Sequence, residues 1–205
     1  MQKISVILLA AGFSRRTDKD NKLLLPIDGK PMLQYAVDLL AVLTDPATST
    51  ASLVDKILVT TINIVSHVKI PDGIKVILNR EPEKGQSESI KVGLKIAKGN
   101  TFFFMVADQP LLTLDDIKPL LSSAINKRDK IIYPLVNERP SAPTIFPERF
   151  KSELLALTGD LGGREIRNRN PQSCFAITAK NPDNFTEINN MVDYYNLFSK
   201  GNSIL

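Results

Sequence analysis

Apolar and polar positions along the chain follow two periodicities. Short apolar runs rich in β-branched residues are typical of strands buried on both faces of a sheet, and they predict strands at residues 4–10, 55–65, 73–79, 101–107 and 130–136. Apolar residues at helical spacing predict helices at residues 31–43, 85–98 and 113–127. Because strand and helix alternate through the first 130 residues, we expect an α/β fold with three layers and a mostly parallel central sheet.

The alternation loosens after residue 136. Proline-rich chain follows, and we then expect two short helical stretches at residues 148–158 and 162–169, a late strand at 172–178 and a helical tail near 187–199. The last forty residues carry no recognisable motif. A chain of 205 residues is long enough for one substantial core and too short for two independent ones. We therefore expect a single domain over residues 1–205.

The composition is that of an ordinary globular protein, with 43% hydrophobic and 23% charged residues. No apolar run reaches the roughly 20 residues that a membrane span requires. The N-terminus enters a strand within three residues and lacks the layout of a signal peptide. We therefore expect a cytoplasmic protein that does not bind membranes.

The rarity of two residue types limits the chemistry. A single cysteine excludes an intramolecular disulfide and a cysteine zinc cluster, and a single histidine leaves little room for a Ser-His-Asp machine. Carboxylates, cations and an oxygen-liganded metal remain. The formal charge of +4 suits a polyanionic small molecule such as a nucleotide, and we expect no nucleic-acid partner because no long basic stripe with aromatics is present.

Two positions follow directly on predicted central strands, and ligands of open α/β sheets bind at the carboxyl ends of such strands. Gly12 follows the first strand, within the stretch LAAGFSRRTDKDNK at 9–22. Ala10, Ala11 and Gly12 are small enough for backbone N–H groups to approach a phosphate. Arg16 and Lys22 add a planar fork and a point charge. The bland alternative is a turn with solvated arginines.

This loop matches neither G-x-x-x-x-G-K-[ST] nor G-x-G-x-x-G, which disfavours a P-loop ATPase and a Rossmann dinucleotide site. It resembles instead, as LAAGFSRR…NKLLLPIDGKPML, the signature of the MobA-like nucleotidyltransferases. The resemblance continues in GQSESIKVGL at 85–94, VADQPLLT at 106–113 and LLALTGDLGGREI at 154–166. Together these motifs resemble most the branch of the molybdenum cofactor cytidylyltransferases. The resemblance implies a Rossmann-like nucleotidyltransferase fold, with a nucleotide-binding part at about 1–112 and an acceptor-binding part at about 113–205.

The resemblance also implies residue roles. Arg16, Lys22 and Asp108 would be catalytic, and Asp108 would hold Mg²⁺, although Asp-Gln-Pro at 108–110 can also serve simply as a turn. Asp160 would be a second metal ligand or would orient the acceptor, unless it is a surface turn, and Arg164 would pair with a phosphate or with Asp160. The remaining substrate-binding residues would be Leu9, Ala10, Ala11, Gly12, Gly85, Gln86, Ser87 and Ser89. For the last four, ordinary capping of a helix is the alternative.

The reaction that the resemblance implies is transfer of CMP from CTP onto the phosphate of molybdopterin, with release of pyrophosphate and possible transient contact with a molybdenum hydroxylase. Two departures from the family pattern stand out: Thr17 and Asp18 replace a Met-Gly pair, and ERPSAPTIF at 138–146 replaces a glycine-containing segment before the acceptor pocket. Two alternatives therefore stay open. One is a transferase for a sugar or alcohol phosphate, and the other is a non-catalytic factor that binds and delivers the cofactor.

Overall fold

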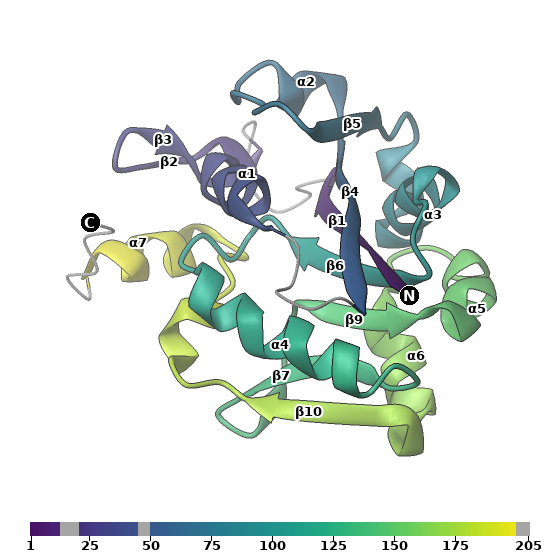
Figure 1. The fold of residues 1–205 in the computed structure, drawn as a ribbon. Coiled ribbons are helices and arrows are strands. Elements are labelled where there is room, and N and C mark those ends of the chain that lie inside the picture. The colour runs from purple at the N-terminus through teal and green to yellow at the C-terminus, as the bar shows by residue number, and fades with distance from the viewer. Residues whose placement is uncertain (13–20, 45–49, 200–205) are drawn as a thin grey trace.

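The computed structural model describes residues 1–12, 21–44 and 50–199, and the central element of this part of the chain is a mixed sheet of eight strands (Figure 1). The strands run in the order β10-β7-β9-β6-β1-β4-β5, and β8 pairs with β7. Their bounds are Gln2–Ala10 (β1), Ala51–Thr60 (β4), Ile74–Leu78 (β5), Thr101–Val106 (β6), Ile131–Val136 (β7), Arg139–Pro140 (β8), Thr144–Pro147 (β9) and Cys174–Thr178 (β10). A separate two-stranded hairpin joins Pro26–Ile27 (β2) to Lys30–Pro31 (β3).

Most neighbouring strands of the sheet are parallel, as the alternation of strand and helix predicts. β1 pairs in parallel with β4 and with β6, β4 with β5, and β7 with β10. β9 runs antiparallel to both of its neighbours, β6 and β7. The predicted α/β fold with a mostly parallel central sheet is confirmed.

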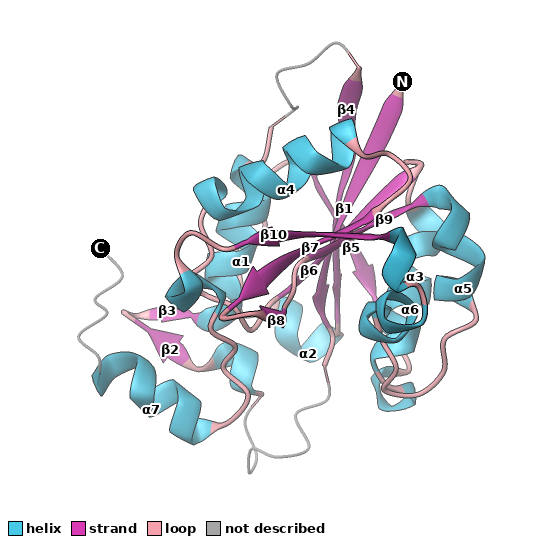
Figure 2. Cartoon of the chain, turned by 90° about the horizontal axis from the view of Figure 1, so that it is seen from below, coloured by secondary structure: helices cyan, strands magenta, loops and turns pink. Residues whose placement is uncertain are grey.

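Helices cover both faces of the sheet, which gives the three layers (Figure 2). Buried residues of α1 and α4 pack on one face, and those of α3, α5 and α6 pack on the other. The helices are Met32–Val42 (α1), Ile62–Val65 (α2), Gln86–Ile96 (α3), Leu114–Asn126 (α4), Lys151–Leu155 (α5), Gly163–Arg169 (α6) and Met191–Ser199 (α7). No helix in the described ranges combines the length and the apolar character needed to cross a bilayer.

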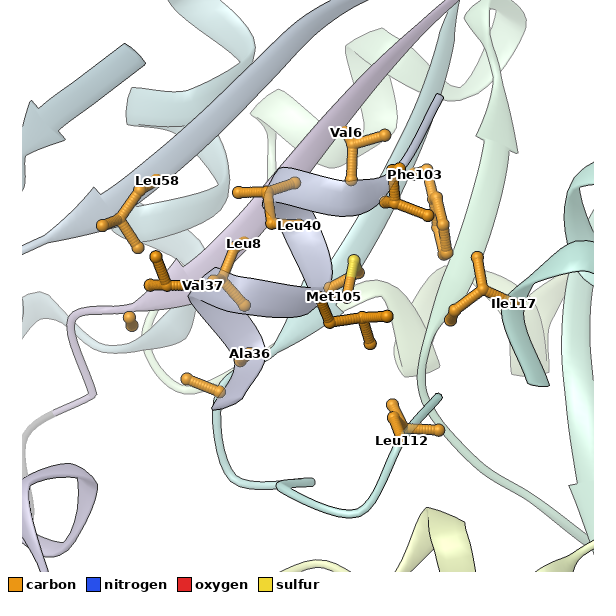
Figure 3. Packing of buried hydrophobic residues seen from close by; sticks show 14 of the residues in the cluster. Val6, Leu8, Ala36, Val37, Leu40, Leu58, Phe103, Met105, Leu112 and Ile117 are labelled. Carbon is orange, nitrogen blue, oxygen red and sulfur yellow. The ribbon is translucent and has the colours of Figure 1, made fainter. Parts of the chain in front are cut away.

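The core follows from the two-residue period of the central strands. Val6 and Leu8 of β1 face α1 and pack near Val37 and Leu40 (Figure 3). Ile7 belongs to the buried cluster on the opposite face and lies next to α3. β1 is therefore buried on both sides and fixes the centre of the sheet.

Two parts of the sequence-based prediction are wrong. The strand predicted at 55–65 begins at residue 51 and ends at 60, and part of the apolar run beyond it forms α2. β9 lies in the proline-rich chain for which no strand was predicted. Its four residues are too few for a periodic pattern, and pairing with β6 and β7 stabilises it instead.

The buried carboxylate of Asp55 links several segments at the edge of the sheet that lies opposite the carboxyl ends of β1 and β6. Asp55 lies at a register irregularity between β1 and β4 and is 3% exposed. Its carboxylate accepts hydrogen bonds from the Ser5 hydroxyl at 2.9 Å and the Lys98 amide at 2.6 Å, and it pairs with the Lys75 ammonium. Burial alone raises the pKa of the Asp55 carboxyl, but these partners outweigh burial and lower its pKa below the ordinary value.

Asp55→Asn is therefore expected to lower the free energy of unfolding by about 2 kcal/mol at neutral pH. Because the folded-state pKa is lowered, the stabilisation is fully present above the unfolded pKa of about 3.9 and is lost as pH falls through the folded pKa. Urea unfolding of both proteins across this range measures the difference, with Asp129→Asn as the exposed control. A difference that stays constant into acid would contradict the assignment.

Candidate functional site

The carboxyl ends of β1 and β6 open into a cavity of about 400 Å³. The two strands are parallel neighbours, with Leu9 opposite Val106, so the segments that follow them emerge at the same edge of the sheet. The lining residues are Leu9, Ala11, Gly12, Lys22, Leu23, Pro82, Gly85, Gln86, Ser89, Val106, Ala107, Asp108, Asp160 and Asn189. The four motifs that predicted a site, which are far apart in sequence, thus all contribute to one cavity.

Most of the predicted site residues that the structure describes line this cavity. Ala10, Ser87 and Arg164 do not line it. Ala10 and Ser87 are buried beside lining residues, and Arg164 is exposed. Arg16 lies outside the described residues, as do Thr17 and Asp18.

A cation and an anion meet at the end of β6. The Lys22 Nζ donates to Asp108 Oδ2 at 2.8 Å and lies 3.4 Å from the side-chain oxygen of Asn189. Lys22 opens a short 3₁₀ turn that Asn21 caps, since Asn21 Oδ1 accepts from the Leu23 amide at 3.0 Å. The side chains of Lys22 and Asp108 are 19% and 22% exposed, so both are reached by solvent and by a ligand.

Gly12 follows β1 at the wall of the cavity. A β-carbon added to Gly12 would meet no atom of the described residues within 4 Å. The close approach of a phosphate to the backbone at Gly12 stays a prediction. Lys22, which pairs with Asp108, lines the same cavity.

The N-terminus of α3 forms another wall. Gly85 precedes the helix with φ of +88°, and no side chain caps the helix there. Ser87 and Ser89 are 1% and 4% exposed. The Ser87 amide donates to the Gly159 carbonyl at 3.1 Å, and the Ser89 hydroxyl accepts from Asn79 at 3.1 Å. The capping alternative for these serines is not what the structure displays: they pack inward and leave the helix terminus to Gly85 and Gln86.

The loop that carries Asp160 packs tightly on this helix terminus. A β-carbon on Gly85 would lie 2.4 Å from the Gly159 backbone and 2.6 Å from Asp160 Oδ1. A β-carbon on Gly162 would lie 2.3 Å from Gln86 Oε1. Glycines at these two positions therefore allow the close approach that brings the Asp160 carboxylate to the cavity wall. Among the described residues, no ion pair links Arg164 to Asp160.

Sequence reasoning missed one further part of the site, which the last forty residues contribute. We call residues 184–190 the strap. The Ile188 amide of the strap donates to the Asp108 carbonyl at 2.9 Å, and Asn189 lines the cavity. Glu187 also lies near Asp108: partial desolvation, followed by the negative charge of Asp108, raises the pKa of its carboxyl. The available signal was weak, because Glu187, Asn189 and Asn190 fall within the helical tail predicted near 187–199, whereas the helix begins only at Met191.

The ligands available for a metal are oxygens. In the described ranges, no group of three or more histidine, cysteine, aspartate and glutamate side chains is arranged to hold a metal ion. Asp108 Oδ2 and Asn189 Oδ1 nevertheless converge on a single cation, the Lys22 ammonium. Mg²⁺ is commonly bound through one or two carboxylates together with substrate phosphates. The residues present therefore fit Mg²⁺ held jointly with a nucleotide.

A known protein family matches most of the chain in sequence. The family model described as the MobA-like NTP transferase domain matches residues 6–174. No curated protein matches the chain in sequence.

Solved structures match almost the whole chain. The Rv0371c homologue from Mycobacterium sp. strain JC1 is 19% identical with a TM-score of 0.79, and the match covers 96% of both chains. Mycobacterium tuberculosis Rv0371c in complex with manganese is 18% identical with a TM-score of 0.72, over 97% of this chain and 99% of that one. CMP:2-keto-3-deoxy-manno-octonic acid synthetase complexed with CTP is 13% identical with a TM-score of 0.72, over 99% and 100%. At these identities the likeness demonstrates the fold.

Proposed function

Because the chain belongs to the MobA-like NTP transferase family, we propose that it transfers CMP from CTP onto the phosphate of a molybdopterin-type acceptor. Enzymes of this family move a nucleoside monophosphate from a nucleoside triphosphate to a phosphate acceptor. In the proposed reaction, an oxygen of the acceptor phosphate forms a bond to the α-phosphorus of CTP. The bond from that phosphorus to the bridging oxygen breaks, and pyrophosphate leaves. The observation that carries the proposal is the Lys22–Asp108 pair, which lines the same cavity as Gly12 at the end of β1.

The proposed roles follow from charge and position. The backbone from Leu9 to Gly12, with Arg16, would hold the triphosphate, and Lys22 would stabilise the negative charge that develops at the α-phosphate. Ribose and base would lie against the start of α3, where Gly85, Gln86 and Ser89 line the cavity. Ser87, packed beneath, would shape that wall. Such transfer depends on positioning and charge neutralisation, which these residues supply without a histidine or a cysteine.

The proposed metal is Mg²⁺, held by Asp108 and, from the convergence described above, by Asn189. Bound there, Mg²⁺ would supply charge neutralisation between the nucleotide and acceptor phosphates. A structure of similar fold was obtained in complex with manganese, another divalent cation. Asp160, which lines the same cavity, would be the second carboxylate.

Cytidine and the molybdenum cofactor are the finer parts of the proposal. Ala11 and the G-x-S-x-S form at 85–89 support CTP, and a protein of similar fold was solved with CTP. TGDLGGREI at 158–166 supports the molybdopterin-type acceptor, with Arg164 as a partner for its phosphate. We propose further that residues from about 113 onward serve the acceptor, and that a molybdenum hydroxylase is contacted when the product is delivered.

Pyrophosphate release from each of the four common NTPs, with Mg²⁺ and with or without molybdenum cofactor, tests the proposal. We expect release with CTP only when the acceptor is present, and loss of release when a chelator removes the metal. Turnover with a sugar or alcohol phosphate instead would replace the acceptor assignment. If no NTP is consumed with any acceptor while the cofactor binds, the chain is a delivery factor and the transfer reaction is overturned.

A further inference from the structure

The residue after Asp108 connects three segments that are distant in sequence. Gln109 is 2% exposed, and its Nε2 lies within hydrogen-bond distance of three oxygens. These are the Ser141 hydroxyl at 3.3 Å, the Ala142 carbonyl at 3.2 Å and the Phe185 carbonyl at 3.1 Å. A single amide thus joins the end of β6, the turn between β8 and β9, and the strap.

The donor half of this amide carries the interaction. Gln109 Oε1 is buried and has no hydrogen-bond partner among the described residues. Exchanging the oxygen and the nitrogen would set the oxygen against two carbonyls, so the orientation is fixed by its surroundings. An unpaired buried oxygen costs about 1–3 kcal/mol. The same side chain donates to two carbonyls of different segments at once, and these two hydrogen bonds oppose the cost of the unpaired oxygen.

Other contacts hold the strap on both sides of Gln109. The Asn184 amide group donates to Asp116 Oδ2 at 2.9 Å, and Asp116 Oδ2 also accepts from the Thr113 amide at the start of α4. At the other end, Asp193 Oδ2 accepts from the Asn190 amide at 3.1 Å. Between these anchors, Phe185 and Ile188 are 5% and 0% exposed. The strap therefore lies fixed at the end of β6, where Asn189 lines the cavity.

The contact from Gln109 to Phe185 controls the segment that brings Asn189 to Asp108. Only three residues separate Phe185 from Asn189, whose side-chain oxygen lies 3.4 Å from the Lys22 Nζ. The contacts to Ser141 and Ala142 act on the other side, because that turn leads directly into β9 beside β6. The Gln109 amide therefore bonds to the strap, which carries the proposed metal ligand Asn189. It also bonds to the turn, which belongs to the proposed acceptor-binding part of the chain.

We propose that Gln109 is a positioning residue that sets the distance between Asp108 and Asn189 and fixes the 141–142 turn relative to them. The proposal rests on the proposed function, which makes Asp108 and Asn189 metal ligands and gives the later residues to the acceptor. The hydrogen bonds of Gln109 do not depend on that function. Removing the Nε2 donor of Gln109 would let the strap and the turn move independently. The distance between the Asp108 and Asn189 oxygens would then vary, and so would the position of the proposed acceptor-binding part.

Gln109→Met, which keeps the length and removes the donor, is the test. We expect Mn²⁺ binding to the protein alone, followed by electron paramagnetic resonance, to weaken about tenfold, as for other losses of a group that orients a metal ligand. Hydrogen exchange at the Ile188 amide should accelerate, whereas exchange in β1 stays unchanged. In turnover, KM for the acceptor should rise more than KM for CTP.

Gln34→Met is the matched control. The Gln34 side chain also holds a loop, donating to the Lys69 carbonyl at 3.0 Å and accepting from the Lys69 amide at 2.8 Å, but it does not line the cavity. It should lose stability without any change in Mn²⁺ affinity. A second variant, Gln109→Asn, keeps the amide on a shorter side chain. It should weaken Mn²⁺ binding and accelerate exchange at the Ile188 amide as Gln109→Met does.

Natural Mn²⁺ affinity together with natural exchange at Ile188 in a folded Gln109→Met protein would overturn the proposal. The same holds for natural Mn²⁺ affinity together with natural exchange at Ile188 in a folded Gln109→Asn protein. If the natural protein binds no Mn²⁺, the metal side of both proposals is lost, and exchange at Ile188 alone decides whether Gln109 holds the strap.

Discussion

Asp108→Asn is expected to lower kcat/KM for pyrophosphate release about a thousandfold, or ~4 kcal/mol of transition-state stabilisation. The substitution preserves the shape of the side chain and removes its charge, so the loss reports the charge that Asp108 places at the end of β6. The Lys22 ammonium would remain in the cavity, where it can still attract the nucleotide. The main loss should therefore appear in kcat, with a smaller change in KM for CTP.

Folding stability separates this effect from misfolding. The Lys22–Asp108 pair is partly exposed, and pairs reached by solvent contribute at most about 1 kcal/mol. Asp108→Asn should consequently unfold at nearly the natural denaturant concentration. Asp115→Asn is the control, because the Asp115 side chain is 84% exposed on α4 and its ion pair is with Lys118 on the same helix. Activity within tenfold of natural in a folded Asp108→Asn protein would remove Asp108 from the catalytic role.

Gly85→Ala is expected to lower the free energy of unfolding by about 3 kcal/mol, which corresponds to a fall in Tm of roughly 9 °C for a chain of this size. The added β-carbon would lie 2.4 Å from the Gly159 backbone, which cannot move aside as a flexible side chain can. The positive φ of Gly85 adds strain for any residue with a β-carbon. Thermal unfolding measures the loss. Activity should fall as well, because the clash displaces Asp160 and the start of α3.

Gly73→Ala separates strain from collision. Gly73 has a similar φ of +85°, but a β-carbon there would meet no atom of the described part of the chain within 4 Å. We expect this control to cost about 1 kcal/mol, the strain alone. If Gly85→Ala costs no more than Gly73→Ala, the close packing of the Asp160 loop on α3 is not a feature of the protein in solution.

The parts of the fold that sequence reasoning predicted are those governed by local periodicity. The strand at 101–107 reads as a continuous apolar run because β6 lies between neighbours and under helices on both faces. The edge where Gly12 and Asp108 meet followed from the parallel order of β1 and β6. Nothing local indicates β9: its pairing partners are more than ten residues away, and two prolines flank or end it.

The site was predicted where one motif lies at one strand end, and was missed where distant contacts build it. Asp108 could be singled out because a carboxylate follows a buried strand. Asn189 could not, because it reaches the cavity through the Ile188–Asp108 and Gln109–Phe185 bonds, which join positions about 80 residues apart. Such contacts leave no periodic trace in the sequence. The role of Arg16 remains a prediction, since Arg16 lies outside the described residues.

The reversed direction of β9 has a consequence for how this protein can vary. A parallel strand delivers the chain that follows it to the cavity edge, whereas β9 delivers the chain that precedes it, because Thr144 at its start lies opposite Phe104 near the end of β6. The 141–142 turn before β9 is therefore brought to the end of β6, where the Gln109 side chain bonds to it. A change in the length of this turn would consequently be felt directly at the segment that follows β6.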